Sequence, residues 1–440
     1  MPRIVFASDS HLNKHYARMT PDQLARRRQQ LREAWRESVD YALSSQADVY
    51  IHGGDLFDGP NPRATELTWA AEQFQRLGDA GLRTFLIGGN HDIPKTRLAG
   101  STPQRLFEKV RLAEVFVDPT RVAWWTGELG GLRLAIGGLP PDPRLPRDAD
   151  PFERLVEPIA RPAGVDYAIL VTHYAVEGTL SPLAEEATIR QASIAALEGV
   201  VDQLLVGHIH TAREMEIGGV KLLFPGPTER LSFGELDLKC GFAEIELRPG
   251  RPRPSARSKH IHTDPQPMRR ETISALDLPA EAPTEWLAER IQAFSAPDQI
   301  LQLRLQGPLQ RAAYQALRLR ELWQLGSELN FYFDLDRHLL TIEVPEPGDM
   351  PYAGAGPVST RGEIARVAEG FLNAAEDALE RELVAAARDR VLALYGSGEI
   401  GDDDRDGPEA PAETGDRDEM PDAAPDAAPD ADRANPEALA

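Results

Sequence analysis

The chain has 440 residues, of which 42% are hydrophobic and 27% charged, a composition typical of a globular protein long enough for two or three domains. No apolar run reaches the roughly eighteen residues that a bilayer-spanning helix needs, and the N-terminus lacks a secretory signal, so we expect a cytoplasmic protein without a membrane segment. The single cysteine, Cys240, excludes an internal disulfide and a zinc site built from thiolates.

The net charge of −22 weighs against nucleic-acid binding, because a phosphate backbone needs local positive potential. Much of this charge lies in residues 399–440, which contain 15 Asp and Glu against 3 Arg. The Pro/Ala/Asp-rich tail 397–440 cannot bury a core, so we expect it to be disordered. Bound metal ions would add positive charge that a residue count omits. Acidity therefore does not exclude DNA as a partner.

Apolar segments alternate with helical ones along the first half of the chain, which predicts an α/β fold with βαβ units. A helix is predicted to begin after Thr20, because Thr20 and Gln23 can form a capping box with Pro21 in the first turn. A second helix is predicted near 64–77, and the Pro/Arg-rich stretch 248–259 is interpreted as a connector. Strands are predicted at 3–7, 48–51, 83–87, 132–136, 167–172, 203–206, 220–224 and 242–247.

A smaller α+β module is predicted from about residue 267 to 350. Leucines alternate with polar residues in 300–305, which indicates a strand; a helix at 309–325 and strands at 331–333 and 339–344 follow. Helical sequence resumes at 360–395. From these changes in pattern and composition along the chain we expect domain boundaries that give the segments 1–262, 263–350, 351–396 and 397–440.

Five polar motifs stand out, and four of them directly follow a predicted strand. They are Asp9-Ser10-His11, Gly54-Asp55, Gly89-Asn90-His91-Asp92, His173 and Gly207-His208-Ile209-His210. Ligands bind at the carboxyl ends of strands in open α/β sheets, so these separate loops can converge on one site. Carboxylate, imidazole and amide oxygen suit Mn²⁺, Fe²⁺ or Zn²⁺. A bridging Asp55 would hold two ions about 3.5–4 Å apart, as in two-metal phosphoester hydrolysis.

Each motif alone also has an ordinary structural explanation. An Asp-x-His or a Gly-Asp pair is usually a turn or a helix cap, and a solitary His173 would usually be a hydrogen-bonded, partly buried histidine. For Asp92 a structural role, such as capping the next turn, is the favoured interpretation. Only the whole set, in this order along the chain, indicates a metal site.

The ordered set resembles the calcineurin-like metallophosphoesterase superfamily over residues 3–212, and within it the SbcD-type DNA repair nucleases. The narrower resemblance rests on Gly54-Asp55-Leu56-Phe57-Asp58, on the segment 173–178 and on the segment 224–235. It implies a β-sandwich flanked by helices, a small α+β capping domain and a helical C-terminal segment.

Carried over residue by residue, the resemblance implies that two ions are held by two sets of ligands that share one carboxylate. The first set is Asp9, His11, Asp55 and His210, and the second is Asp55, Asn90, His173 and His208. The resemblance implies His91 as the catalytic acid at the leaving 3′ oxygen, with a hydroxide activated by two metal ions as the nucleophile. It further implies Mn²⁺, 3′–5′ exonuclease and single-strand endonuclease activity on DNA, and a role in repair or recombination. Asp58 departs from relatives that have a histidine there.

Contacts with DNA need cations for the phosphates and aromatic rings for unpaired bases. Lys14, Tyr16 and Arg230 are the candidates, and an ordinary surface role stays open for each. For Arg26-Arg27-Arg28, a solvated helix surface is at least as good an interpretation as DNA binding. In the family, helices after the capping domain dock onto a coiled-coil ATPase of the SbcC type. Here residues 360–395 are expected to do so, through an apolar face formed by Ile364, Phe371, Leu379 and Leu383. Packing of this face on the capping domain or pairing in a homodimer stays open, and we also expect a homodimer.

Two other functions stay open. One is a small-molecule phosphodiesterase, for instance on cyclic nucleotides, which would share the metal motifs; the sequence after residue 220 argues against it. The other is a scaffold subunit with a silent metal site, against which stands the complete set of ligands.

Overall fold

The computed structural model describes residues 1–96, 100–179, 186–250, 254–343, 367–369, 371–372 and 378–396. The chain forms two compact units, Met1–Glu343 and Val344–Ala440, which are treated one at a time below. The domain boundaries inferred from the sequence stay predictions, and the acidic tail 397–440 lies outside the described residues. Within the described part of the chain, no helix combines the length and the apolar character needed to cross a membrane.

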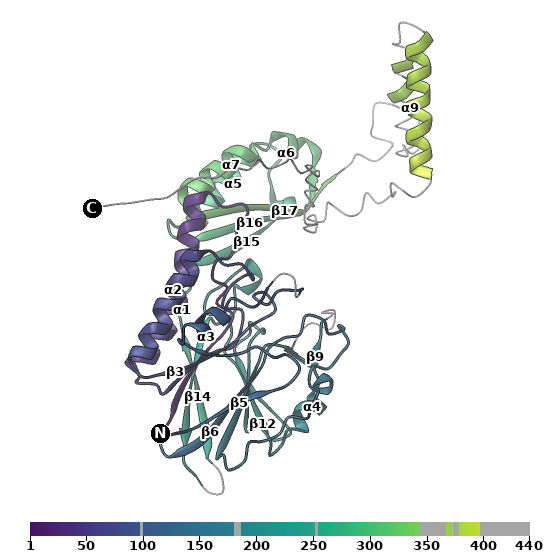
Figure 1. Ribbon diagram of the computed structural model, residues 1–440. Coiled ribbons are helices and arrows are strands. Elements are labelled where there is room, and N and C mark those ends of the chain that lie inside the picture. Colours follow the sequence, from purple (N-terminus) through teal and green to yellow (C-terminus); the bar gives the residue numbers. More distant parts are fainter. Residues whose placement is uncertain are drawn as a thin grey trace, which may run out of the picture. The chain divides into compact units, whose positions relative to one another are not determined.

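Two mixed six-stranded sheets form the body of the first unit (Figure 1). The strands of the first sheet are β1 (Arg3–Ala7), β2 (Val49–His52), β3 (Arg83–Ile87), β4 (Glu114–Phe116), β13 (Gly241–Arg248) and β14 (Ser255–His262). Their order is β14-β13-β1-β2-β3-β4, with β1 to β4 parallel and β13 and β14 antiparallel to their neighbours. This confirms the predicted α/β class.

The second sheet has a parallel centre and one antiparallel strand at each edge. Its strands are β5 (Ala123–Leu129), β6 (Leu132–Leu139), β7 (Tyr167–Thr172), β10 (Gln203–Val206), β11 (Arg213–Ile217) and β12 (Val220–Phe224). Their order is β11-β12-β10-β7-β6-β5, with β12, β10, β7 and β6 parallel. A small two-stranded sheet pairs β8 (Ala175–Val176) with β9 (Thr188–Ile189).

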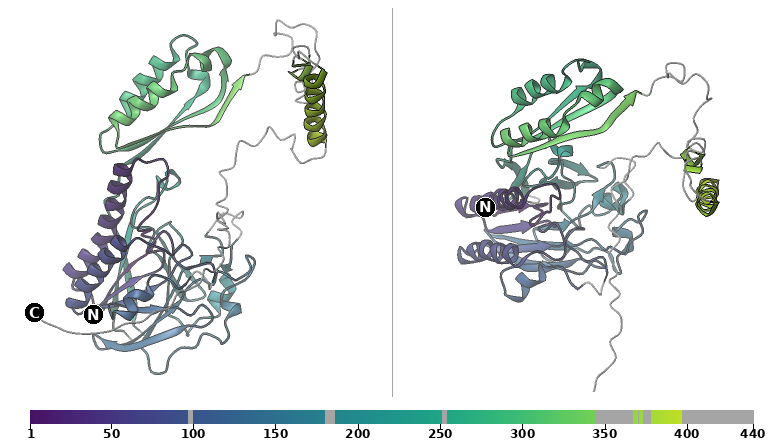
Figure 2. Two further views of the ribbon diagram at one scale, coloured as in Figure 1. Left: turned by 45° about the horizontal axis from the view of Figure 1, so that its top comes forward. Right: turned by 90° about the horizontal axis from the view of Figure 1, so that it is seen from above.

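Alternating side chains of the central strands fill two cores. In β1, Ile4 and Phe6 pack between the sheets with Ile169 of β7, whereas Val5 packs outward with Trp35 of helix α1 (Pro21–Ser44), because successive residues of a strand face opposite sides. Helix α1 and helix α2 (Ala64–Asp79) lie side by side along the first sheet (Figure 2). The second sheet is covered by α4 (Gln191–Ala195), and α3 (Arg105–Lys109) precedes β4. Strands covered on both faces are continuous apolar runs.

The start of α1 agrees with the sequence prediction. The side chain of Thr20 accepts a hydrogen bond from the backbone N–H of Gln23, and the Gln23 side chain accepts one from the backbone N–H of Thr20 at 3.0 Å. Pro21 occupies the first turn. The predicted connector 248–259 is wrong in part, since Ser255–His262 forms the edge strand β14, paired with β13.

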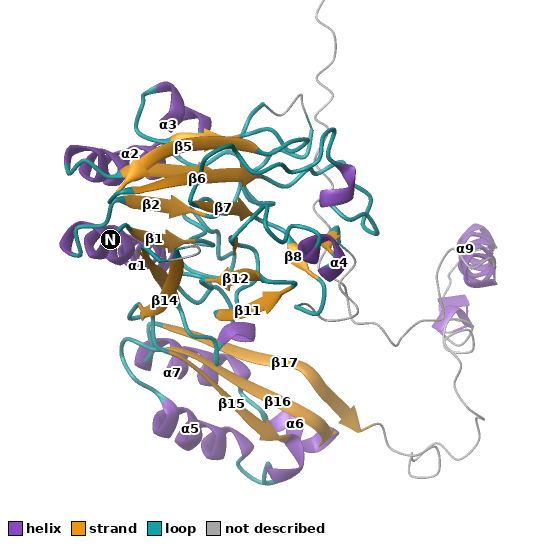
Figure 3. Cartoon of the chain, turned by 90° about the horizontal axis from the view of Figure 1, so that it is seen from below, coloured by secondary structure: helices purple, strands orange, loops and turns teal. Residues whose placement is uncertain are grey.

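A third, parallel sheet ends the first unit. It consists of β15 (Met268–Ser274), β16 (Ile300–Gln310) and β17 (Tyr332–Glu343), and Figure 3 shows these strands beside α5 (Pro283–Phe294), α6 (Arg311–Ala316) and α7 (Leu319–Leu329). The predicted single helix 309–325 is wrong: the chain becomes extended at Leu317, whose side chain is buried in the core of this module. The two short strands predicted at 331–344 are one strand, and β15 and α5 were not predicted.

In the second unit, helix α9 spans Ala378–Gly396. Residues 367–369 and 371–372 are also helical. Phe371 and Leu383 are exposed, and Ile364, another member of the predicted partner-binding face, lies outside the described residues.

Candidate metal centre

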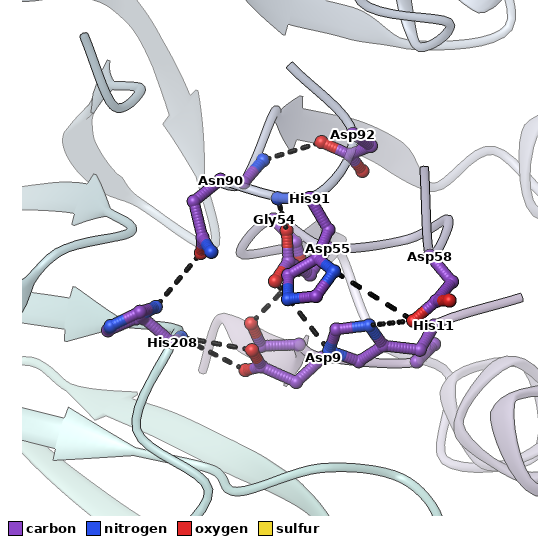
Figure 4. Close-up of polar contacts among 12 residues, drawn as sticks. Asp9, His11, Gly54, Asp55, Asp58, Asn90, His91, Asp92 and His208 are labelled. Carbon is purple, nitrogen blue, oxygen red and sulfur yellow. Dashed lines mark hydrogen bonds and ion pairs between the residues drawn. The ribbon is translucent and has the colours of Figure 1, made fainter. Parts of the chain in front are cut away.

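Loops at the carboxyl ends of five strands bring the predicted site residues together. Asp9 and His11 follow β1, Asp55 follows β2, and Asn90 and His91 follow β3. From the second sheet, His173 follows β7, and His208 and His210 follow β10. Figure 4 shows Asp9, His11, Asp55 and His91 facing one another, with Asn90 and His208 beside them. The site therefore lies where both sheets end.

The carboxylate of Asp55 lies between two groups of donors. Its Oδ2 is 3.6 Å from Nε2 of His11 and 3.2 Å from Nε2 of His173. Asp9 makes a similar link, since its Oδ1 is 3.6 Å from Nε2 of His210 and 3.8 Å from Nε2 of His173. Asp9, His11 and His210 thus form one compact group of donors, and Asp9, Asp55 and His173 form another.

Asn90 and His208 stand at the side of His173. The Asn90 side-chain oxygen is 3.2 Å from Nε2 of His173 and 2.9 Å from Nδ1 of His208. The other ring nitrogen of His208 is 2.9 Å from Glu186 Oε2, and its backbone N–H donates to both carboxylate oxygens of Asp9 at 3.1 Å. Asn90 therefore lies between His173 and His208, and His208 is turned toward Glu186.

Three histidines are oriented by partners that hold Nδ1 and leave Nε2 toward the centre. His173 donates to the carbonyl of Gly53 at 2.7 Å, and His210 donates to Glu235 Oε1 at 2.7 Å. His11 donates to Asp58 Oδ1 at 3.1 Å. Such outer partners fix the tautomer and the ring angle of a metal-binding histidine. The sequence reasoning assigned no role to Gly53 or Glu235, although Glu235 belongs to the motif 224–235.

The carboxylates and histidines of the site shift one another's pKa values. Burial alone would raise the pKa of Asp9, but His173 and His210 outweigh it and hold that pKa well below its usual range. Burial alone would lower the pKa of His173, but the carboxylates of Asp55 and Asp9 outweigh burial and raise that pKa to about 9. The pKa of His210 rises to about 10, against burial, through hydrogen bonds to Asp9 and Glu235. The negative charge of the two buried carboxylates thus favours the cationic form of the histidines beside them.

The chemistry of the donor set fits divalent metal ions. Nε2 of His11 is buried and has no hydrogen-bond partner among the described residues, an arrangement that is costly unless the atom binds something else. Asp9 and Asp55 are almost fully buried. Carboxylate oxygens, imidazole nitrogens and one amide oxygen together match the preferences of Mn²⁺, Fe²⁺ or Zn²⁺.

The backbone of the site is strained in the way functional loops often are. Asp9, His11, Asp55 and His208 all have positive φ, between 45° and 75°, a conformation that costs non-glycine residues about 1–3 kcal/mol each. Gly89 is needed for close approach, because a Cβ there would lie 2.1 Å from Asp55 Oδ1. Packing of the surrounding loops maintains this geometry.

His91 and Asp92 have separate tasks. The His91 ring packs edge-on against the His11 ring at 4.7 Å, its Nδ1 is 3.8 Å from Asp58 Oδ1, and 44% of its side chain is exposed. Asp92 is buried and accepts hydrogen bonds from the backbone N–H groups of Leu56 and Gly89 at 2.9 and 2.6 Å. Asp92 thus ties two site loops together, which confirms the structural role predicted for it.

Of the predicted substrate contacts, Lys14 is tied to the centre through Asp58, and Tyr16 lies beside Lys14. Lys14 Nζ is 2.9 Å from Asp58 Oδ1 and 6.0 Å from the centre of the Tyr16 ring. Arg230 is partly buried, and its carbonyl accepts a hydrogen bond from Arg27. The interpretation of Arg26-Arg27-Arg28 as solvated surface is wrong for two members, because Arg27 is fully buried and Arg28 nearly so. Arg27 lies 3.4 Å from buried Glu229.

Comparison with known proteins agrees with this fold and site. Residues 2–212 match the family described as calcineurin-like phosphoesterase. Residues 2–212 therefore form a calcineurin-like phosphoesterase domain.

Its relatives include the DNA double-strand break repair protein Mre11 of Haloferax volcanii, 27% identical over 70% of this chain and 62% of that protein. The protein of the same name from Sulfurisphaera tokodaii is 28% identical over 50% of this chain and 52% of its own. The matches thus span less than two thirds of these relatives. A putative 5′-nucleotidase structure from Staphylococcus aureus shares 14% identity, over 59% of this chain and 54% of that one, with a TM-score of 0.36. The relatives confirm the predicted resemblance to SbcD/Mre11 repair proteins.

Proposed function

We propose that the chain is a metal-dependent nuclease that hydrolyses phosphodiester bonds of DNA, as a 3′–5′ exonuclease and single-strand endonuclease in repair or recombination. The observation that carries the hydrolytic part is the position of Asp55, whose Oδ2 lies within 3.6 Å of His11 and 3.2 Å of His173. DNA as substrate is supported by relatives named as DNA double-strand break repair proteins.

In this proposal Asp9, His11, Asp55 and His210 hold one divalent ion, and Asp55, Asn90, His173 and His208 hold the other, with Mn²⁺ as the favoured metal. Bound ions would supply Lewis-acid charge for the phosphate and lower the pKa of an attacking water. The protein itself orients the ligands, through one backbone carbonyl and two carboxylates. Gly53, Asp58 and Glu235 hold the three histidine rings in place.

His91 is proposed as the catalytic acid. Its half-exposed ring can meet the substrate, while its backbone N–H donates to Asp55 Oδ1 at 2.9 Å and anchors it to the centre. As the bond from phosphorus to the leaving 3′ oxygen breaks, a ring N–H of His91 would transfer its proton to that oxygen. Lys14 and Arg230 are proposed to bind neighbouring phosphates, and Tyr16 to contact a base.

The proposed partners are DNA, a coiled-coil ATPase of the SbcC type bound through residues 360–395, and a second copy of the chain. Exposed Phe371 and Leu383 support an apolar contact in that segment. A cytoplasmic location stays a prediction.

The test uses purified protein with Mn²⁺ and three substrates: linear duplex DNA, circular single-stranded DNA and a cyclic nucleotide. We expect cleavage of both DNAs, and loss of cleavage in His91→Ala with metal binding retained. Cleavage of the cyclic nucleotide alone would contradict the DNA assignment and favour a small-molecule phosphodiesterase. The absence of metal-dependent hydrolysis of all three would favour the scaffold interpretation.

A further inference from the structure

A pocket of about 260 Å³ lies between the loop before α1, the segment 231–233 and the third sheet. One wall comes from the loop before α1, with Tyr16 and Arg18, and another from the segment 231–233, with Phe233. The third wall is formed by the first residues of the third sheet, including Tyr332. Hydrogen bonds join these walls: Gln23 Nε2 donates to the carbonyl of Phe331 at 2.8 Å, and Arg18 Nη1 is 3.3 Å from Asp334 Oδ1.

The pocket combines aromatic surfaces with cations at its rim. Tyr16, Phe233 and Tyr332 supply three aromatic rings, each only partly buried. The Arg27 guanidinium lies 5.7 Å from the centre of the Tyr16 ring and interacts with its buried hydroxyl. At the rim, the Arg18 side chain is 81% exposed, and the Arg270 guanidinium lies 5.6 Å from the Phe233 ring centre.

The pocket matches a nucleotide better than a peptide side chain, because it combines aromatic rings with arginines at its rim. A nucleobase is flat, stacks on aromatic rings and carries polar edges, and its phosphate is anionic. An aliphatic side chain would neither stack on the rings nor pair with the arginines at the rim.

The pocket is also linked to the metal centre by two short segments of chain. Tyr16 lies five residues after His11, and Lys14 between them is 2.9 Å from Asp58, which holds His11. On the other side, Phe233 lies two residues before Glu235, which holds His210 at 2.7 Å. A strand whose phosphodiester sits at the metal centre can therefore place a nearby base in the pocket.

We propose that this pocket binds one unpaired nucleobase of the strand being cleaved, which makes single-stranded DNA and frayed duplex ends the preferred substrates. The inference rests on the proposed function and adds to it the form of DNA that the site selects. A paired base cannot enter, because its polar edge and both faces are occupied in the duplex.

The test measures base stacking directly. Oligonucleotides carrying 2-aminopurine at successive positions are bound, with Mn²⁺, to the full chain in the His91→Ala background, so that DNA is held without being cleaved. Fluorescence of 2-aminopurine falls when it stacks on an aromatic ring. We expect strong quenching at one position near the scissile phosphate, and its loss in Phe233→Leu and Tyr332→Leu, which keep apolar volume but remove the ring.

Affinity for single-stranded DNA provides the second readout. Base–aromatic stacking is worth about 1–3 kcal/mol, so each leucine variant should bind about 5- to 150-fold more weakly, while Phe233→Tyr should restore binding. An abasic site at the quenched position should weaken wild-type binding as much as the leucine variant does, without an additive loss when the two are combined. Trp323→Leu is the matched control, because Trp323 is an exposed aromatic residue of α7 that does not line the pocket. Thermal unfolding checks that each variant is folded.

Quenching and affinity that are the same in wild type and both folded leucine variants would overturn the inference while leaving the nuclease assignment intact. Failure of the wild-type chain to bind or cleave any DNA would instead contradict the proposed function, and this inference with it.

Discussion

Glu235 is the residue outside the predicted ligand set whose removal should most clearly change metal binding. Its Oε1 accepts the hydrogen bond from His210 Nδ1 at 2.7 Å, and its Oε2 accepts one from the backbone N–H of Leu231 at 2.6 Å. In Glu235→Ala the His210 ring loses the partner that aims Nε2 at Asp9. Loss of such a partner typically weakens metal binding about 10- to 100-fold, which corresponds to about 1.4–2.7 kcal/mol.

The loss should fall on one ion only. His210 belongs to the group of Asp9 and His11, whereas His173 is held independently by the carbonyl of Gly53. Calorimetric titration with Mn²⁺ should therefore show one weakened and one unchanged binding event in Glu235→Ala. Glu235→Gln, whose amide oxygen can still accept from His210, should lose less.

Glu216→Ala is the matched control, because Glu216 is an exposed carboxylate on the nearby strand β11. The control should bind both ions as the wild type does. The reasoning would be refuted if Glu235→Ala bound both ions with wild-type affinity, or if both binding events weakened equally.

Two further changes follow from the geometry. Arg27→Met should lower the free energy of unfolding by about 3–5 kcal/mol, because buried Glu229 then lacks its cation 3.4 Å away; urea denaturation measures this, and a loss below about 1 kcal/mol would contradict it. Gly89→Ala should abolish binding of both ions, because its Cβ would lie 2.1 Å from Asp55 Oδ1. Gly59→Ala is its control, since a Cβ there meets no atom within 4 Å. Metal content of the purified variants provides the measurement, and a full complement of metal in Gly89→Ala would show that Asp55 is not the shared ligand.

The parts of the fold that the sequence predicted correctly are those decided by local chemistry. The strand at 167–172 is an unbroken apolar run because both faces of its sheet are covered. The start of α1 was predicted because the Thr20–Gln23 capping box involves residues three apart. By contrast, β14 was missed, since an edge strand is stabilised by backbone pairing with β13 and can carry charged side chains such as Lys259.

Arg27 shows why burial was harder to predict. It lies in a helix among charged residues, which favours a solvated surface, yet the segment that covers it is more than 200 residues away in the chain. The Arg27 guanidinium contacts Glu229 and the carbonyl of Arg230. This contact exists only when the strands that lie between α1 and residue 229 in the chain are packed together. No pattern within α1 carries that information.

The same division holds for the metal centre. The sequence alone determined the kind of donors and their place after strands, because ligand chemistry belongs to each side chain and strand ends are local features. Only the tertiary structure decided that Asp55 stands between His11 and His173, and that Gly53 and Glu235 orient His173 and His210. Gly53 and His173 are 120 residues apart. Such distances are set by the packing of one sheet on the other, which no short segment of chain encodes.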